Sequence, residues 1–577
     1  MNKNSILAIA LSTVVVMVSL FINQRILQNK VETASYEEQT VTSEVVNSEN
    51  SIKNKESLVK PVNNKVAEET ITINTEKAEI VLTNRGGDII SYKLISHKDI
   101  DTNEGVQLVD NVTEMNRACA VSFGGVNNPI INDVFNVDKI SEYEYLFTKE
   151  FKVESNGTYK SFILGKRYKF DPNDYMFKLD VLIHNNSEDG SLDFDNVAYT
   201  IRTSPQIGPH FNPKLNKYEN RQFVSYNGNK AKKIILSKNQ IKEYNKDYIW
   251  DGIVGKYFAN LVVPENHTSM GYSYYSSEIE VDDYANAQAL LVRKPITEVD
   301  SKDTYYFYYG PRNEKELKIY NVSENNPWNL SGLRLTEALQ SSGWLGWLET
   351  ILKWVMELLY KLIPNWGVSI ILMTILLKLA MFPFTRKQSL STLKMQEIQP
   401  KIQAVQEKYR DNPQKQQEML AKVYQEAGYN PMSGCLPMIV QFFVLFAMYN
   451  LFNNYFEFRG ASFIPHWIDD LSVGDSVYTL KVNLPFLGNH IRILPLIYLA
   501  SQLFYGKITN NGGAAPTSGK FNMNLMMYGM PILFFFIFYN APSGLLLYWT
   551  VSNIIQMVQQ IVINNLMKKK KAELAKK

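Results

Sequence analysis

Lys378 is the residue whose type and position point most directly to chemistry. It lies near the middle of residues 366–384 (WGVSIILMTILLKLAMFPF), which otherwise have the composition of a membrane-spanning helix. A charge at the centre of a span costs about 2.5–3.5 kcal/mol on insertion scales, so it is expected to face water, a partner or a substrate. Thr374 lies four residues earlier and is predicted to share its helix face. Alternatively, Lys378 snorkels to an interface or pairs with a buried polar group.

Further polar residues are predicted to follow one face of the last apolar segment, residues 544–563. Their spacings of four, four and three residues place Tyr548, Ser552, Gln556 and Gln559 together. The alternative role for such residues is hydrogen bonding between helices, worth about 0.6 kcal/mol each. The candidate substrate groove comprises Lys378, Thr374, Gln441, Tyr548, Trp549, Ser552 and Gln556.

Composition and motifs narrow the function classes. The chain has 577 residues, enough for several domains, and its net charge of +3 argues against nucleic acid as the main partner. Its two cysteines, Cys119 and Cys435, are predicted to lie in different compartments, so no disulfide is expected. The sequence has no H-E-x-x-H, G-x-S-x-G or P-loop motif. We therefore expect no enzymatic activity, cofactor or metal site.

The N-terminal region is predicted to be an anchor followed by a linker. Residues 1–22 contain an apolar stretch, 5–22, of about the length that spans a bilayer. A cleaved signal peptide is the alternative, but no A-x-A-like site closes the stretch. Residues 23–70 are rich in Glu, Asn, Ser and Lys and favour a flexible linker.

Residues 71–330 have the pattern of a large all-β domain, for which we expect a sandwich. Aromatic and branched residues fill runs such as 175–184 and 304–309, and turn signals at 185–190 and 310–311 bound them.

Residues 331–364 are predicted to be a linker and an interfacial amphipathic helix. An ordinary surface helix on a soluble domain is the alternative. The expected apolar face consists of Trp344, Leu348, Ile351, Leu352, Val355, Leu359 and Leu362. The expected polar face consists of Gly346, Thr350, Lys353, Glu357 and Lys361.

Residues 365–567 are predicted to form a membrane core of five spans with a polar helical hairpin at 385–429. Asp411-Asn412-Pro413 marks the turn of the hairpin, and Pro400 is expected to kink or interrupt its first arm. The expected seam comprises Leu390, Leu393, Ile402, Val405, Tyr409, Leu420, Val423 and Tyr424. The spans after the one that holds Lys378 are expected at about 434–455, 486–505, 525–540 and 544–563.

Basic residues predict the topology. The hairpin, the 506–524 loop and the 568–577 tail are basic, whereas the 456–485 loop carries more acids than bases. The positive-inside rule places the first three in the cytoplasm and the last outside. Both termini are then cytoplasmic, and residues 23–364 are external.

Several motifs resemble the YidC family of membrane protein insertases, in its Gram-negative form with a large periplasmic domain. The resemblance covers residues 343–567 most specifically, and Leu82-Thr-Asn-Arg-Gly-Gly87 carries it more weakly in the β domain. The motifs are Asn365-Trp-Gly-Val-Ser369, Met373–Thr385, Gln399-Pro-Lys-Ile-Gln403, Asn430–Pro437 with Gln441, and Pro542–Tyr548 with Ser552-Asn553.

Three positions depart from the family pattern. Lys378 stands where the family usually has arginine, so the charge is kept without the bidentate fork. Phe443 stands where a proline is frequent, and Tyr548-Trp549 replaces a Tyr-Tyr pair. The charge state of Lys378 is therefore less fixed than that of an arginine.

The resemblance implies an inner-membrane protein with a β-supersandwich external domain and five core helices around a hydrophilic groove. Nascent membrane proteins would enter the groove and leave sideways into the phospholipid bilayer, with or without the Sec translocon. The basic hairpin and the lysine tail would contact the ribosome or anionic lipid; for the tail, a role in topology alone is the alternative.

Two other classes fit part of the pattern. An ion-coupled transporter or channel would also use an intramembrane lysine, although the spans show no obvious inverted repeat. The second alternative class is a membrane-tethered enzyme that acts on sugars through the β domain, but no convergent catalytic carboxylates support this class.

Overall fold

The computed structural model describes residues 59–576, apart from 63–65, 100–101, 110–111, 115, 156–157, 187–190, 206, 210–220, 236–239, 245–247, 266–268, 278–285, 340–344, 430, 485–486 and 510–528. The predicted anchor and most of the predicted linker lie outside this part. The described chain divides into two compact units, a β domain up to residue 339 and a helical unit from residue 345.

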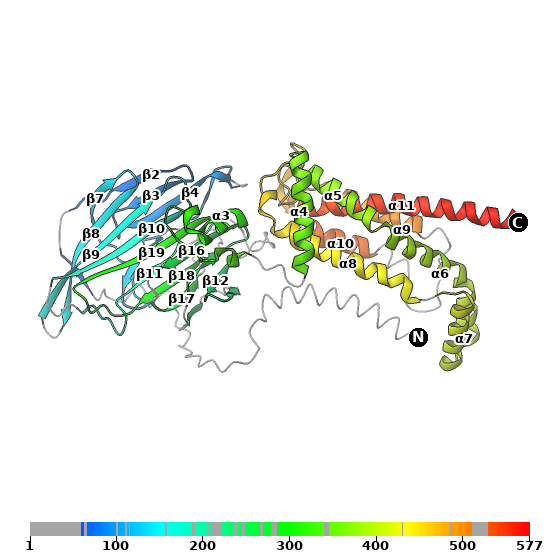
Figure 1. Cartoon of the computed structure of the whole chain (residues 1–577), viewed down its shortest axis with the longest axis horizontal. Coiled ribbons are helices and arrows are strands. Elements are labelled where there is room, and N and C mark those ends of the chain that lie inside the picture. The colour runs from blue at the N-terminus through cyan, green and yellow to red at the C-terminus, as the bar shows by residue number, and fades with distance from the viewer. Residues whose placement is uncertain are drawn as a thin grey trace. The chain divides into compact units, whose positions relative to one another are not determined.

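Three antiparallel sheets build the β domain (Figure 1). The largest follows the order β1-β8-β9-β10-β19-β16-β15-β12-β13, and β7 also pairs with β8. Its strands are β1 (Lys60–Pro61), β7 (Asn136–Ser141), β8 (Glu144–Ser155), β9 (Thr158–Phe170), β10 (Met176–Asn185), β12 (Gln222–Tyr226), β13 (Ala231–Ile235), β15 (Trp250–Val254), β16 (Phe258–Pro264) and β19 (Asp300–Pro311). β1 falls within the residues predicted as linker, because its backbone pairs with the edge of β8.

Two smaller sheets complete the β domain. One has the order β14-β17-β18-β11-β6 and the other β2-β3-β4-β5. The first contains β6 (Val121–Phe123), β11 (Tyr199–Arg202), β14 (Gln240–Tyr244), β17 (Ser269–Ser277) and β18 (Asn286–Arg293). The second contains β2 (Thr70–Asn74), β3 (Ala78–Thr83), β4 (Asp88–Lys98) and β5 (Gly105–Gln107).

Aromatic side chains join the sheets face to face. Phe123 of β6 lies edge-on to Phe151 and Phe162 of the large sheet, at 5.1 and 5.3 Å between ring centroids. Tyr92 of β4 likewise contacts Phe177 and Tyr309. Aromatic side chains from facing sheets therefore fill a shared core, and the central strands β15 and β16 are buried along their whole length.

A buried ion network supports the turn between β3 and β4. Asp88 accepts hydrogen bonds from Lys166 and from Arg117 Nε, the latter at 2.8 Å. Lys166 Nζ also donates to the carbonyl oxygens of Gly86 and Cys119, at 3.1 and 2.8 Å. Burial lowers the pKa of Lys166, and the charge of Asp88 opposes this shift.

Glycine at position 86 is required for that network to close. Gly86 has φ +71°, and a Cβ there would lie 2.5 Å from Asp88 Oδ2 and 2.6 Å from the Ile131 carbonyl oxygen. The Gly-Gly pair of the 82–87 motif thus lets the chain turn directly over a buried charge.

Short helices end the β domain. They are α3 (Glu314–Lys318) and the 3₁₀ turns Ile319–Asn321, Ser323–Asn325 and Leu335–Ala338. Trp250 Nε1 donates to the Leu333 carbonyl oxygen at 2.8 Å, and Arg312 Nε donates to that of Ala338 at 2.8 Å. Residues 331–339, predicted as part of a linker, therefore pack on the β domain.

The helical unit contains eight labelled helices among its described residues (Figure 1). They are α4 (Gly346–Leu362), α5 (Trp366–Ala380), α6 (Phe382–Lys408), α7 (Pro413–Glu426), α8 (Pro431–Asn454), α9 (Leu494–Thr509), α10 (Met530–Phe538) and α11 (Ser543–Lys576). A short ribbon, β20 (Tyr478–Leu484) with β21 (Gly488–Ile491), precedes α9.

The predicted spans are matched unevenly. One described helix, Ser543–Leu566, is long and apolar enough to cross a membrane, and α5 with residues 382–391 gives a second candidate bent by 59°. The prediction of a continuous span at 366–384 is wrong, because α5 ends at Ala380 and Pro383 begins a new helix direction. The span predicted from residue 486 begins instead at Leu494, since β21 occupies 488–491.

The predicted hairpin is formed by α6 and α7. Asn412 caps α7 by accepting from the Lys415 backbone N–H, and Pro413 begins the helix. Ile398, Ile402 and Leu420 form the seam, with Val405, Val423 and Tyr424 packed against them. The predicted interruption at Pro400 is wrong, because α6 continues through it.

The α4 helix carries carboxylates on its packed face and apolar side chains on its exposed face, which differs from the predicted division into one apolar and one polar face. Glu349 is buried and accepts from Asn450 Nδ2 at 3.1 Å, and Glu357 accepts from the Tyr455 hydroxyl at 3.0 Å. These donors satisfy carboxylates on the packed face, which leaves apolar side chains outside. The exposed face consists of Trp347, Ile351, Trp354, Leu358 and Leu362.

The ends of the helical unit differ. In Figure 1, α4 lies across one end, and α6, α7 and the C-terminal part of α11 lie at the other. Trp366, at the start of α5, contacts Phe458, just after α8. The Gly544 backbone N–H, at the start of α11, donates to the Leu471 carbonyl oxygen. The 456–475 loop is therefore at the α4 end.

Candidate functional site

Lys378 is buried between α5 and α11, with 5% of its surface exposed. Its Nζ donates to Gln556 Oε1 at 3.1 Å, and its backbone carbonyl oxygen accepts from Gln559 Nε2 at 3.3 Å. Among the described residues, no carboxylate lies within ion-pair distance of Lys378. The ammonium has three donors and is held here by a neutral amide.

The amide of Gln556 connects the lysine to a third helix. Gln556 Nε2 donates to the hydroxyl oxygen of Tyr505 on α9, at 3.0 Å. The chain Lys378–Gln556–Tyr505 thus crosses from α5 through α11 to α9 and fixes the amide so that its oxygen faces the ammonium. The sequence placed Lys378 and Gln556 in one site, but it did not single out Tyr505.

The other predicted site residues have different surroundings. Thr374 is fully buried, and its hydroxyl donates to the Ile370 carbonyl oxygen of its own helix at 2.6 Å. Tyr548 packs against Phe452, while Trp549 packs edge-on against Phe538 at 4.7 Å. Both aromatic residues belong to the apolar core of the helical unit.

Two predicted residues lie on the expected helices. Ser552 is buried on α11, one turn before Gln556, which agrees with the predicted shared face. Gln441 lies within α8, but its side chain is outside the described part of the structure. The role of each candidate in binding a substrate stays a prediction.

A second polar contact lies further along α11. Ser389 of α6 donates to Gln560 Oε1 at 2.8 Å, and Gln560 Nε2 donates to Asn564 Oδ1 at 2.9 Å. Ser389 and Gln560 were not predicted from the sequence, although Gln560 directly follows Gln559 on the predicted polar face of α11. Polar side chains therefore continue from Lys378 toward the end of the unit that carries α6 and α7.

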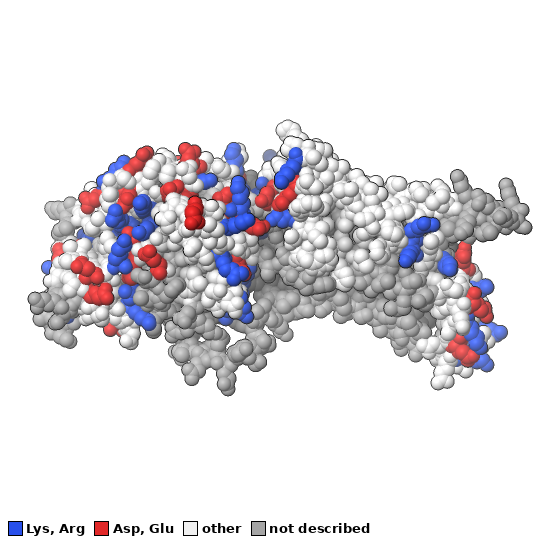
Figure 2. All heavy atoms as spheres, in the orientation of Figure 1, with Lys and Arg blue, Asp and Glu red and all other residues white. Residues whose placement is uncertain are grey.

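The outer surface around this polar line is apolar. The exposed apolar side chains of α5, α9, α10 and α11 include Leu379, Phe504, Leu533 and Val558. On the face shown in Figure 2, charged side chains of the helical unit gather near α4 and near α6–α7, with an uncharged stretch between them. This arrangement suits a lipid environment around a polar interior.

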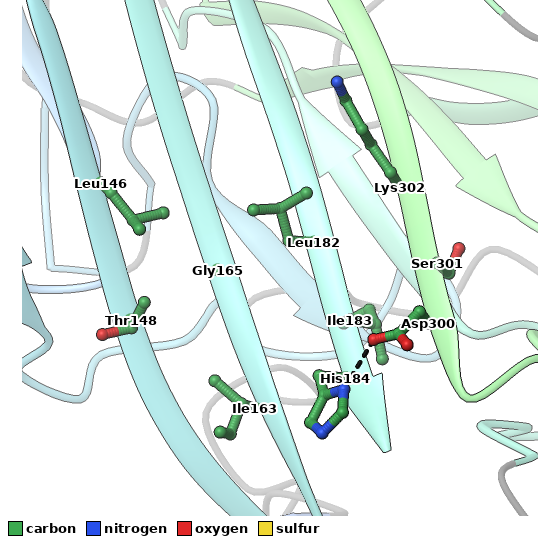
Figure 3. Close-up of a pocket in the computed structure, with 10 residues that line it drawn as sticks. All are labelled: Leu146, Thr148, Ile163, Gly165, Leu182, Ile183, His184, Asp300, Ser301 and Lys302. Atoms are coloured by element: carbon green, nitrogen blue, oxygen red, sulfur yellow. Dashed lines mark hydrogen bonds and ion pairs between the residues drawn. The ribbon is translucent and has the colours of Figure 1, made fainter. Parts of the chain in front are cut away.

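The β domain contains an open cavity of about 360 Å³ on its large sheet. Figure 3 shows Leu146, Gly165 and Leu182 on neighbouring strands, with the His184–Asp300 pair at one side. His184 Nδ1 and Asp300 Oδ1 lie 2.6 Å apart, and both side chains are exposed. The lining is mostly apolar, and the described residues contain no group of His, Cys, Asp or Glu arranged for a metal.

The two units match models of known protein families. Residues 70–357 match the YidC periplasmic domain, and residues 358–571 match the 60Kd inner membrane protein. Among solved structures, a galactose mutarotase related enzyme from Lactobacillus acidophilus aligns with 42% of this chain and 97% of its own, at 12% identity and a TM-score of 0.27. That likeness is too slight to carry an argument.

Two curated relatives extend the match to most or all of the chain. The membrane protein insertase YidC of Treponema denticola is 42% identical over an alignment of 588 positions, which covers 99% of this chain and 100% of the relative. That of Treponema pallidum is 38% identical and covers 87% of this chain and 86% of the relative. The chain therefore belongs to the YidC family of membrane protein insertases, which are proteins of the inner membrane.

Proposed function

We propose that Lys378 is the positive charge through which this insertase brings the polar or acidic flank of a nascent membrane protein into the bilayer. The observation that carries the proposal is the burial of Lys378 against a neutral amide, with no carboxylate at ion-pair distance among the described residues. Its charge is thus held in place without being neutralised. An acidic side chain of the substrate would supply the missing counter-ion.

The energetics favour transient binding. At an intermediate dielectric, attraction between Lys378 and a substrate carboxylate is worth on the order of a few kcal/mol. This offsets part of the desolvation cost that blocks a polar flank from crossing lipid. The apolar segment of the substrate then moves into lipid, which contributes about 25 cal/mol per Å² of apolar area buried. No covalent step or cofactor is needed.

The two ends of the helical unit support the predicted orientation. The acidic 456–485 loop is at the end with α4, whereas the basic α6–α7 hairpin and the end of α11 are opposite. The positive-inside rule then assigns α6–α7 to the cytoplasm and α4 to the external interface. The 1–22 anchor would start in the cytoplasm, so that residues 23–364 are periplasmic.

The cytoplasmic end offers contacts for further partners. The α6–α7 hairpin and the 568–577 tail are basic, as expected for contact with ribosomal RNA or anionic lipid. The apolar flanks of the core would allow side-by-side work with the Sec translocon. These assignments rest on charge and on the family.

The test is insertion of a single-span substrate with an acidic external flank into phospholipid vesicles that contain the purified full-length protein. Lys378→Ala should lose most insertion, whereas Lys378→Arg should retain it, because arginine keeps the charge. Lys361→Ala, which removes an exposed lysine on α4, is the matched control and should insert normally.

Normal insertion by Lys378→Ala would refute the role of the charge. Ion flux through vesicles with the wild-type protein, in the absence of insertion, would instead favour a transporter or channel.

A further inference from the structure

The β20–β21 ribbon is a two-stranded sheet that pairs with no third strand in the described structure. Its strands are antiparallel, with Tyr478 opposite Ile491 and Thr479 opposite His490. Side chains of a strand alternate between two faces, so these two pairs lie on opposite faces of the ribbon.

One face of the ribbon is apolar and exposed. Tyr478, Leu480, Val482 and Leu484 occupy every second position of β20, whose register with β21 shifts between Thr479 and Leu484. The exposed fractions of Tyr478 and Val482 are 63% and 68%. Ile491 of β21 adds a further apolar side chain to this face.

The opposite face is polar. The Thr479 hydroxyl lies 3.2 Å from His490 Nδ1, and the exposed Lys481 lies two residues further along β20, where the register with β21 shifts. A sharp separation of this kind normally places the apolar face on a core. An isolated two-stranded ribbon is at best marginally stable in water.

The base of the ribbon is tied firmly to the start of α9. Asp475 Oδ2 accepts from the backbone N–H groups of Ile493 and Leu494, at 2.8 and 2.9 Å, and from Trp467 Nε1 at 2.9 Å. Arg492 Nη1 donates to the Asp475 carbonyl oxygen at 2.7 Å.

Arg492 also joins the ribbon to the end of α10. Its Nε donates to Asn540 Oδ1 at 3.1 Å, and its backbone N–H donates to the Tyr539 hydroxyl oxygen at 3.1 Å. The ribbon therefore starts at a fixed level, where α9 begins and α10 ends.

This level lies next to the lipid-facing surface of the helical unit. Ile493, Leu496 and Ile497 at the start of α9 are exposed apolar residues, and they directly follow the ribbon in sequence. The apolar surface of the ribbon thus continues that of α9. In the topology proposed above, this surface of α9 would face acyl chains.

We propose that the apolar face of β20–β21 inserts into the headgroup–acyl boundary of the outer leaflet, with the phospholipid bilayer as its partner. Lipid supplies the apolar surface that the ribbon lacks within the protein, as it does for interfacial helices. Tyr478 suits this depth, because tyrosine ring and hydroxyl fit the interface, and Lys481 faces water or phosphate. The proposal rests on the topology given under Proposed function.

The neighbouring positions 481 and 482 test the insertion of the ribbon into lipid, because side chains of consecutive strand residues point in opposite directions. In the full-length protein with Cys119→Ala and Cys435→Ala, a nitroxide is attached at Val482→Cys or at Lys481→Cys, and each protein is placed in phospholipid vesicles. Collisions with oxygen, which enriches in lipid, and with a water-soluble nickel chelate are measured. The ratio of oxygen to nickel collisions should be on the order of tenfold higher at position 482.

Equal nickel accessibility at both positions would overturn the proposal, because the ribbon would then stand in water. Protection of position 482 from both oxygen and nickel would also overturn it and indicate a covering protein surface.

A membrane-impermeant maleimide separates this proposal from the topology. Lys481→Cys should react when the reagent is added from the periplasmic side of cells with a permeabilised outer membrane. Reaction only after the cytoplasmic side is opened would refute the topology and this proposal with it. Rapid reaction of both Val482→Cys and Lys481→Cys from the periplasmic side would leave the topology standing and refute the ribbon's insertion alone.

Discussion

Two buried lysines, Lys166 in the β domain and Lys378 in the helical unit, show opposite treatments of a buried charge. Lys166 is fully buried and contacts the carboxylate of Asp88, which Arg117 also contacts. Lys378 is almost as deeply buried, but its ammonium donates to the amide oxygen of Gln556. Asp88 gives Lys166 a partner of opposite charge, whereas Gln556 gives Lys378 only a neutral hydrogen-bond acceptor.

The difference indicates which charge serves the fold and which is available for a substrate. In the β domain, two buried cations, Lys166 and Arg117, share the carboxylate of Asp88, and removing it leaves both charges buried without a counter-ion, which destabilises the fold. A cation held by a neutral amide retains its attraction for an anion. Variants that remove the carboxylate partner of Lys166, or give Lys378 a carboxylate partner, therefore test the comparison directly.

The largest effect is expected from Asp88→Ala, which leaves Lys166 and Arg117 buried without their carboxylate. We expect the β domain to lose about 3–5 kcal/mol of stability. Hydrogen exchange of the strand amides in the full-length protein, followed by mass spectrometry under increasing urea, localises the loss to this domain.

Glu68→Ala is the control, because Glu68 forms an exposed ion pair with Arg85. It should leave exchange unchanged, since exposed pairs contribute little. An equally small effect of Asp88→Ala would show that the network is dispensable for the fold.

A second buried group sharpens the comparison, because Asp251 of β15 is a fully buried acid whose pKa burial raises well above its ordinary 3.8. A group whose folded pKa is raised contributes stability at low pH and loses it as pH rises above the unfolded value. Asp251→Asn should therefore make the β domain more stable than the wild type at pH 8, because the asparagine does not ionise in the unfolded chain.

The advantage of Asp251→Asn should shrink as pH falls toward 4, where the wild-type carboxyl is protonated in both states. Hydrogen exchange across this pH range, corrected for intrinsic rates, measures the difference. A stabilisation that does not depend on pH would contradict the assignment of a neutral buried acid.

Gln556→Glu converts the helical site into the β-domain arrangement by giving Lys378 a carboxylate partner. It should reduce insertion of substrates with acidic flanks on the order of tenfold, because the internal carboxylate competes with the substrate. Gln556→Leu, which removes the amide without adding charge, should reduce insertion less. Equal effects of the two variants in the vesicle assay would argue that Gln556 acts only through packing.

The smallest effect is expected from Tyr505→Phe, which removes the hydrogen bond that orients the Gln556 amide. One neutral hydrogen bond is worth about 0.5–1.5 kcal/mol, so insertion should fall only a few-fold. In a Gln556→Leu background the same change should have no further effect, because the amide is gone. Additive losses would show that the two residues act independently.

The sequence predicted the elements better than their ends and contacts. Runs of aromatic and branched residues between turn signals indicated the β domain. The turn at Asn412 was recognisable because its residue types are specific to helix starts. Apolar composition alone could not separate β21 from the following span, since Ile491 and Leu494 fit either element. A 59° bend after Ala380 likewise leaves no trace in hydropathy.

In the candidate site, too, some residues could be predicted from the sequence and others could not. A lysine within an apolar segment was visible in the sequence, and helical spacing placed Gln556 on a shared face of α11. Tyr505 could not be found, because its role depends on how α9 packs against α11. The contact of Glu357, expected on the polar face of α4, could not be found either, since its donor is the distant residue Tyr455.

The most direct measurement is a double-mutant cycle between Lys378 and the substrate. Wild-type and Lys378→Ala proteins are each assayed in vesicles with a substrate whose external flank carries aspartate, and with the same substrate carrying asparagine. We expect Lys378→Ala to reduce insertion of the aspartate substrate on the order of tenfold more than insertion of the asparagine substrate. Equal impairment of both substrates would contradict the claim that the unneutralised charge of Lys378 recognises the flank.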